Sequence, residues 1–133
     1  MQCREAAAEL TRLLAEVEAI ASETPDTRAF EPTLVVMVAL LRSSPDCRQL
    51  LAQKLVRFAR HGKPQEYEPL LGPGQRETIE FTMHTLRWPE VAECLRQLRD
   101  THPNPSVRRI AIGCLSAFED DWGGRDLWST YSG

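Results

Sequence analysis

The sequence lacks any long run of apolar residues. Its longest run, Leu34 to Leu41, falls far short of the ~20 residues that a helix needs to cross a bilayer. The chain begins with polar and charged residues and has no apolar signal core there. We therefore expect a soluble, cytoplasmic protein with no membrane partner, unless another system exports it.

The sequence also lacks the local motifs of catalysis and of cofactor binding. It has no glycine-rich phosphate loop and no pattern that resembles a catalytic triad, although a triad assembled in space leaves no local trace. Glu80 and His84 lie one helical turn apart, but the second histidine of a metalloprotease helix is absent. These absences predict a protein that is not an enzyme and that needs no cofactor and no metal.

Closely spaced cysteines are absent as well, and this excludes a zinc knuckle or a local redox pair. The four cysteines lie far apart along the chain, at Cys3, Cys47, Cys94 and Cys114. Cys47 and Cys114 fall on apolar faces of expected helices, where a free thiol packs as a small hydrophobic group. We expect free cysteines, which fit a reducing compartment.

Excess positive charge is missing, because the net charge of the 133 residues is −3. The chain is therefore too acidic to be an obvious nucleic-acid binder. The charge is uneven: residues 31–76 hold seven basic and four acidic residues, whereas residues 119–133 hold four acidic residues and one arginine. A basic group within the first segment is either a solvated face or a site for an acidic partner: Lys54, Arg57, Arg60 and Lys63.

What the sequence does have is helical periodicity. Apolar spacing and the placement of proline, glycine and capping residues predict about six helices, at residues 3–22, 32–42, 45–60, 75–87, 89–101 and 105–118. Residues 61–74 are rich in glycine and proline and predict a packed loop. The expected fold is all-α, in a single domain that spans residues 1–133.

Two of the predicted helices carry specific expectations. Helix 32–42 is apolar on every side, so we expect neighbours to cover it completely. Its valines would also suit a strand, but its flanking segments are helical. Helix 3–22 is amphipathic and either closes one end of the molecule or forms a self-association seam. The expected state is a monomer or a weak dimer.

A sequence repeat relates helix 45–58 to helix 105–118 at an offset of 60 residues, with Pro45 matching Pro105. The preceding helices match as well, because Pro32 corresponds to Pro89 at an offset of 57. Such repetition predicts stacked helical units, which usually present surfaces for partners. Gly113 lies inside one repeated helix at a cost of roughly 1 kcal/mol, which suggests close approach by a neighbour.

The repeated unit resembles a HEAT repeat. A helix, a turn that contains aspartate and proline, and a second helix with Val-Arg and an Ala/Leu face carry this resemblance at Asp100, Pro105, Val107, Arg108, Ala111 and Leu115. Residues 89–118 match well, and residues 32–60 match less well. The resemblance implies a short, irregular α-α superhelix. It also implies that Arg48 and Arg108 bond to acidic or carbonyl groups between units.

The C-terminal part is similar to a more particular group, through residues 86–91 and 117–122. It resembles small bacterial HEAT-like immunity proteins of polymorphic toxin systems. The resemblance implies a protein that binds a cognate toxin domain and occludes it without chemistry. It covers about a third of the chain, and a shared fold does not fix a shared function. The alternatives are an adaptor or scaffold for a host regulatory protein and, less favoured, a helical-repeat lyase or small-molecule binder.

All but one of the candidate partner-binding residues follow the last strong helix; the exception is Trp88, at the corner before helix 89–101, whose alternative role is core packing. Acidic groups beside an aromatic suit a toxin domain with a basic cleft. The alternative for the tryptophans is structural, because terminal helices of a stack need a cover. The predicted set is Trp88, Glu119, Asp120, Asp121, Trp122, Asp126 and Trp128.

Overall fold

The computed structural model of the chain describes residues 2–61 and 68–132. Within these ranges the fold is all-α, with six α-helices and no strand. The helices are α1 (Cys3–Glu23), α2 (Glu31–Ser43), α3 (Arg48–His61), α4 (Gln75–Leu86), α5 (Pro89–Thr101) and α6 (Pro105–Ser116). Three short 3₁₀ turns are η1 (Thr27–Ala29), η2 (Pro45–Cys47) and η3 (Gly123–Leu127).

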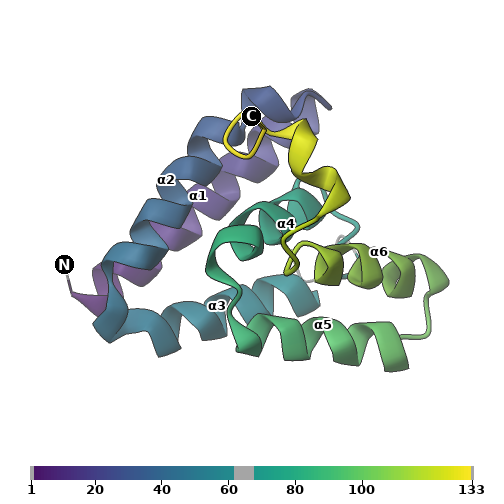
Figure 1. The fold of residues 1–133 in the computed structure, drawn as a ribbon. Coiled ribbons are helices and arrows are strands. Elements are labelled where there is room, and N and C mark those ends of the chain that lie inside the picture. Colours follow the sequence, from purple (N-terminus) through teal and green to yellow (C-terminus); the bar gives the residue numbers. More distant parts are fainter. Residues whose placement is uncertain (1, 62–67, 133) are drawn as a thin grey trace.

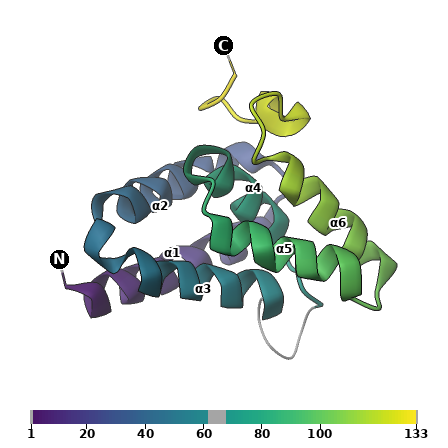
Figure 2. The same ribbon diagram turned by 60° about the horizontal axis from the view of Figure 1, so that its bottom comes forward.

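The helices form two pairs that are joined by α3 and α4. Helices α1 and α2 lie side by side at one end of the molecule, and α5 and α6 lie side by side at the other (Figure 1). Helix α3 packs against both α1 and α5, and α4 packs against α2, α3 and α6. Figure 2 shows the same arrangement from below, with α3 and α5 at the front. The buried side chains of all six helices form one continuous core.

The ends of the helices follow the local signals in the sequence. Pro89 and Pro105 occupy first helical positions, where the missing backbone N–H costs nothing. Asn104 caps α6, because its side-chain oxygen accepts a hydrogen bond from the Ser106 amide at 2.9 Å. The predicted helix 45–60 is divided, since η2 comes first and α3 begins at Arg48.

Helix α4, rather than the apolar α2, is the covered helix of the fold. Its inner residues include Thr78 and Thr82, which are completely buried beside Ile79. Each threonine hydroxyl donates a hydrogen bond to a carbonyl one turn back, to Gly74 at 2.7 Å and to Thr78 at 2.8 Å respectively. These bonds satisfy the hydroxyls within the helix, so polar residues can be buried there at little cost.

The prediction that neighbours cover helix 32–42 on every side is wrong. Val35 is 45% exposed and Val36 is 51% exposed, although Leu34 and Met37 are completely buried. The reason is position, because α2 packs against α1 and α4 and its opposite face lies at the surface. Isolated exposed valines are ordinary on protein surfaces.

The prediction that Cys47 is a free thiol is also wrong. A disulfide joins Cys47 to Cys3, across a sequence separation of 44 residues, and ties the start of α1 to η2. Cys94 and Cys114 are free and buried. The bridge removes the argument that cysteine usage fits a reducing compartment, since disulfides persist mainly in oxidising ones.

The structure also bears on two further expectations, for Gly113 and for the predicted loop 61–74. A Cβ atom at Gly113 would meet nothing within 4 Å, so no close neighbour explains this glycine, contrary to the sequence-based expectation. The predicted loop 61–74 lies partly outside the described residues, and so does its Tyr67. In its described part, Leu70 is buried at a backbone φ of 67°, whereas Leu71 is exposed.

The paired arginines of the repeat differ in their contacts. Arg48 donates two hydrogen bonds to the Glu90 carboxylate at 2.8 and 2.9 Å and so joins α3 to α5. Arg108 instead donates to the carbonyls of His102 and Pro103, at 2.8 and 3.0 Å, and closes the turn before its own helix. The two positions therefore match in sequence but differ in acceptor, a carboxylate for Arg48 and backbone carbonyls for Arg108, and only Arg48 joins two helices.

Candidate functional site

The candidate site is the C-terminal segment that follows α6, residues 117–132, which we call the docked tail. It turns at residues 117–121, forms η3 and then runs over the start of α2 (Figure 1). Only Trp88 lies outside this tail, and the other six of the seven sequence-predicted site residues lie in it: Glu119, Asp120, Asp121, Trp122, Asp126 and Trp128. Trp122 lies directly before η3.

Buried tryptophans hold the docked tail against the helices. Trp128 is 1% exposed and packs edge-on against Phe30 and Phe81, with ring centroids 6.0 and 4.9 Å away. Trp122 is 4% exposed and contacts the His84 ring at 4.9 Å between centroids. Large aromatic rings in such edge contacts contribute strongly to packing. Both tryptophans therefore cover the core and offer little surface to a partner.

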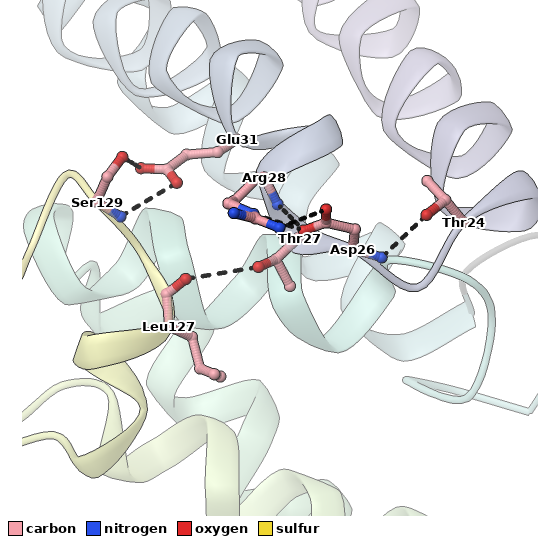
Figure 3. A network of polar contacts seen from close by, with 7 residues as sticks. All are labelled: Thr24, Asp26, Thr27, Arg28, Glu31, Leu127 and Ser129. Carbon is pink, nitrogen blue, oxygen red and sulfur yellow. Dashed lines mark hydrogen bonds and ion pairs between the residues drawn. The ribbon is translucent and has the colours of Figure 1, made fainter.

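A buried carboxylate at the start of α2 holds the end of the tail. Glu31 is 5% exposed, and its two oxygens accept hydrogen bonds from the amide and hydroxyl groups of Ser129 and Thr130. The two amide donors lie 3.2 Å (Ser129) and 2.8 Å (Thr130) from the carboxylate oxygens. Figure 3 shows Glu31 facing Ser129 and, beside them, the Thr27 hydroxyl, which donates to the Leu127 carbonyl at 3.5 Å. The tail is thus fixed at two successive points.

These hydrogen bonds decide the charge of Glu31. Burial pushes the pKa of the carboxyl upward, but the donors on Thr130 and Ser129 outweigh it and hold the pKa below its ordinary value. Glu31 therefore stays a carboxylate at neutral pH. A carboxylate that accepts several hydrogen bonds binds them more strongly than a neutral acceptor does.

Tyr131 completes the attachment of the tail. Its hydroxyl donates to the Phe81 carbonyl at 2.7 Å and also contacts the Thr85 hydroxyl, while its ring packs on His84. Arg125 donates to the Tyr131 carbonyl at 3.1 Å, inside the tail itself. Burial raises the pKa of the Tyr131 phenol, against a lowering effect of the Thr85 hydrogen bond. The phenol is therefore neutral, as its role as a donor requires.

The carboxylates of the tail point to solvent, and together they form the acidic edge: Glu119, Asp120, Asp121 and Asp126. Arg87 donates to the Asp120 carboxylate at 2.7 Å, and Arg125 donates to the Asp120 carbonyl at 3.4 Å. The Arg87 hydrogen bond and charge lower the pKa of Asp120. Leu127, which is 65% exposed, follows Asp126 directly. Leu127 is therefore an exposed apolar side chain next to the acidic edge, whereas Trp122 and Trp128 are buried.

Trp88 lies apart from the acidic edge. It is 6% exposed at the start of α5, and the Arg48 guanidinium lies 4.7 Å from the centre of its ring. A cation over an indole ring stabilises the junction between α3 and α5. The burial of Trp88 supports a role in packing, and its side chain offers little exposed area to a partner.

Glu80 and His84, one turn apart in α4, each contact another residue: the Glu80 carboxylate lies near Arg76, and the His84 ring lies near Ala117. The His84 Nδ1 lies 2.8 Å from the Ala117 carbonyl and donates to it, so this nitrogen carries a proton. Burial raises the pKa of Glu80 to about 7, against a lowering effect of Arg76 and with a further rise from Glu77. Within the described ranges, no three His, Cys, Asp or Glu side chains gather where they could hold a metal ion.

From the sequence, no role was assigned to two charged residues that bind the tail from outside it, Glu31 and Arg87. Glu31 is an acidic residue in the first turn of a helix, and this position looks like ordinary helix-end chemistry in a sequence. Arg87 ends α4 with a left-handed φ of 51°. No signal in the sequence connects either residue to a segment at least 33 residues further on.

Comparisons with known proteins place no constraint on this site, because no protein-family model, curated protein or solved structure matches the chain. Among the described residues, no helix combines the length and the apolar character that crossing a membrane requires.

Proposed function

We propose that this protein is a protein-binding inhibitor, an immunity protein that neutralises a cognate bacterial toxin domain by occluding it. The observation that supports this function is the acidic edge: four exposed carboxylates on a tail that buried aromatic rings and Glu31 hold in place. Their charge suits a partner with a basic cleft, such as a nuclease or a nucleotide-modifying domain.

The docked tail is well built for this role in physical terms. A segment that is already ordered loses little conformational entropy when it binds, so more of the contact energy appears as affinity. Carboxylates on the surface accelerate encounter with a basic partner. Leu127 supplies an apolar contact within the same edge. Occlusion needs no catalytic group, and it works with the protein as a monomer.

The resemblance of residues 86–91 and 117–122 to small HEAT-like immunity proteins is the second support. The first stretch contains Arg87 and the second contains Asp120, and these two residues pair in the structure. The stretches that carry the resemblance thus meet at the acidic edge.

The test uses a toxin domain encoded by the gene beside the one for this protein. Asp121→Lys with Asp126→Lys reverses two charges that have no hydrogen bond or ion pair in the described structure, so folding should be retained. We expect binding by titration calorimetry to weaken at least tenfold, and protection of cells against the toxin to fall in parallel. Leu127→Ala should weaken binding further without changing the dependence on salt.

The matched control is Glu5→Lys with Glu23→Lys, which makes the same charge change on exposed positions of α1. The control should bind like the wild type. If the tail variant binds as well as the control, the acidic edge is not the interface. If the wild-type protein neither binds nor protects against the adjacent toxin, the immunity function is rejected.

A further inference from the structure

A second surface, on the solvent side of α3, carries positive charge. Helix α3 contains four arginine or lysine residues and no aspartate or glutamate. Arg48 is neutralised by Glu90, but the other three have no ion pair with a carboxylate in the described part of the chain. Lys54 donates to the Thr11 hydroxyl at 2.8 Å, and Arg60 donates to the Gln97 side chain at 2.9 Å. The solvent side of α3 therefore keeps its positive charge and forms a basic strip.

Two grooves flank this helix. One, of about 420 Å³, lies between α3 and α5 and is mostly polar, with Gln49, Gln53 and Arg60 among its lining residues. The other, of about 250 Å³, lies between α1 and α3. Apolar side chains dominate the second groove, and they include Leu14, Ala15 and Phe58.

Arg57 connects the two grooves, because it lines both of them. Its side chain is exposed and has no hydrogen bond or ion pair with any described residue. An unpaired guanidinium between a polar and an apolar groove suits a ligand that carries a carboxylate and an adjacent apolar group. Grooves on both sides of one helix also favour an extended ligand over a compact one.

From these contacts we propose that the α3 surface binds an acidic, partly apolar segment of a partner protein. A carboxylate of the segment pairs with Arg57, and a neighbouring apolar side chain enters the groove formed by Leu14 and Phe58. All the basic residues that line the two grooves belong to α3, and the charged lining residues from α1 and α5 are Glu18 and Glu90, so the positive charge forms a narrow strip along one helix. A narrow strip fits a peptide better than the broad backbone of a nucleic acid, which requires a wide basic surface.

This surface is separate from the acidic edge. Helix α3 and the docked tail lie on opposite sides of the molecule in both views (Figures 1 and 2). A partner on α3 and a toxin on the tail can therefore be bound at the same time, and the inference does not depend on the proposed function.

The experiment titrates ¹⁵N-labelled protein with 12-residue peptides in which Asp or Glu alternates with Leu or Phe, and follows the backbone amides by NMR. We expect shifts in α3 and in the adjoining faces of α1 and α5. Arg57→Glu should weaken the affinity at least tenfold. Ala15→Trp, which fills the apolar groove without a change in charge, should weaken it by a similar factor.

The matched control is Arg109→Glu, because Arg109 is also exposed, in the middle of α6, without a hydrogen bond or ion pair among the described residues. The proposal is overturned if no peptide binds, if Asn/Gln versions bind equally well, or if Arg57→Glu and Arg109→Glu lose the same affinity. Stronger binding of a 12-nucleotide single strand at α3 would instead identify a nucleic-acid surface. Concentration-dependent shifts of α3 in the protein alone would identify a second copy as the occupant.

Discussion

At the scale of single residues, Glu80 shows how burial changes the chemistry of a common side chain. Its carboxyl lies in the middle of α4, with its Oε1 3.5 Å from the Arg76 Nε. It is close enough to the free Cys114 thiol to raise the pKa of that thiol, after the larger effect of burial. Because the pKa of Glu80 is raised to about 7, its protonated form predominates below neutral pH.

This shift predicts how stability depends on pH. The folded protein holds the Glu80 proton up to about pH 7, whereas the unfolded chain releases it near its reference pKa of 4.5. Stability is therefore lost as pH rises between these two values. Glu80→Gln, which mimics the neutral acid, should be more stable than the wild type at pH 8 by up to about 3 kcal/mol, and little different at pH 4.5.

Urea unfolding at pH 4.5 and at pH 8 measures this effect. The control is Glu77→Gln, because Glu77 also pairs with Arg76 but is less buried. A stability difference between wild type and Glu80→Gln that is the same at both pH values would contradict the prediction.

At the scale of elements, the docked tail is a segment without a regular helix that is nevertheless fixed. Its regular structure is only the short η3 turn, so helix propensity contributes little. Instead, aromatic packing on Phe81 and hydrogen bonds to Glu31 supply its attachment. A segment held by such a small set of contacts is expected to open locally before the core unfolds.

Glu31→Gln tests this attachment directly. A glutamine has one acceptor oxygen where the carboxylate has two, and it has no charge, so we expect the tail to lose about 2 kcal/mol of local stability. Hydrogen exchange of the Thr130 amide, which donates to Glu31, should accelerate at least tenfold, while amides in the middle of α5 stay unchanged.

Acid should have the same effect in the wild type. The pKa of Glu31 is lowered by folding, so its contribution is complete above the ordinary pKa and disappears as pH falls through the folded value. Glu5→Gln, an exposed position in the first turn of α1, is the control. Equal exchange of the Thr130 amide in the Glu31 and Glu5 variants would show that Glu31 does not hold the tail.

At the scale of the whole molecule, the disulfide between Cys3 and Cys47 connects the first helix to the corner before α3. It closes a long segment of chain and so restricts the unfolded state. The same two residues were expected to be unpaired, and their pairing changes how the protein should respond to its surroundings. Its stability should depend on redox conditions.

Reduction should lower the free energy of unfolding by about 2–4 kcal/mol, because the bridge spans a separation of 44 residues. Thermal unfolding with and without dithiothreitol measures the loss. Cys3→Ser should match the reduced wild type and should not respond to dithiothreitol, although it retains the buried Cys94 and Cys114. A wild-type protein whose unfolding is unchanged by reductant would contradict the bridge.

The helices and their ends were largely predictable from the sequence, because the signals are local. Proline at the start of α5 and α6 and the Asn104 cap act within one turn of the chain. The prediction of which helix is covered was wrong, and part of the reason is again a local contact. Apolar character marked α2, but the hydroxyls of Thr78 and Thr82 bond within α4 and allow that more polar helix to be buried.

The candidate site was predictable in part. The sequence showed the carboxylates of the acidic edge, because four acids and one arginine in the last residues are visible as composition. It could not assign the tryptophans, since a tail tryptophan can cover the core or contact a partner with the same neighbours in sequence. Burial of Trp122 and Trp128 supports the first role and leaves the exposed apolar contact to Leu127.

The sequence by itself determined the all-α class, the positions of the helices and the gathering of acid at the C-terminus, because periodicity, capping and charge are local properties. Only the tertiary structure decided which helix is covered, that Cys3 forms a disulfide with Cys47, and that Glu31 accepts hydrogen bonds from Ser129 and Thr130. Those outcomes join residues between 44 and 99 positions apart. Contacts over such distances depend on how the helices pack, and no local pattern records that packing.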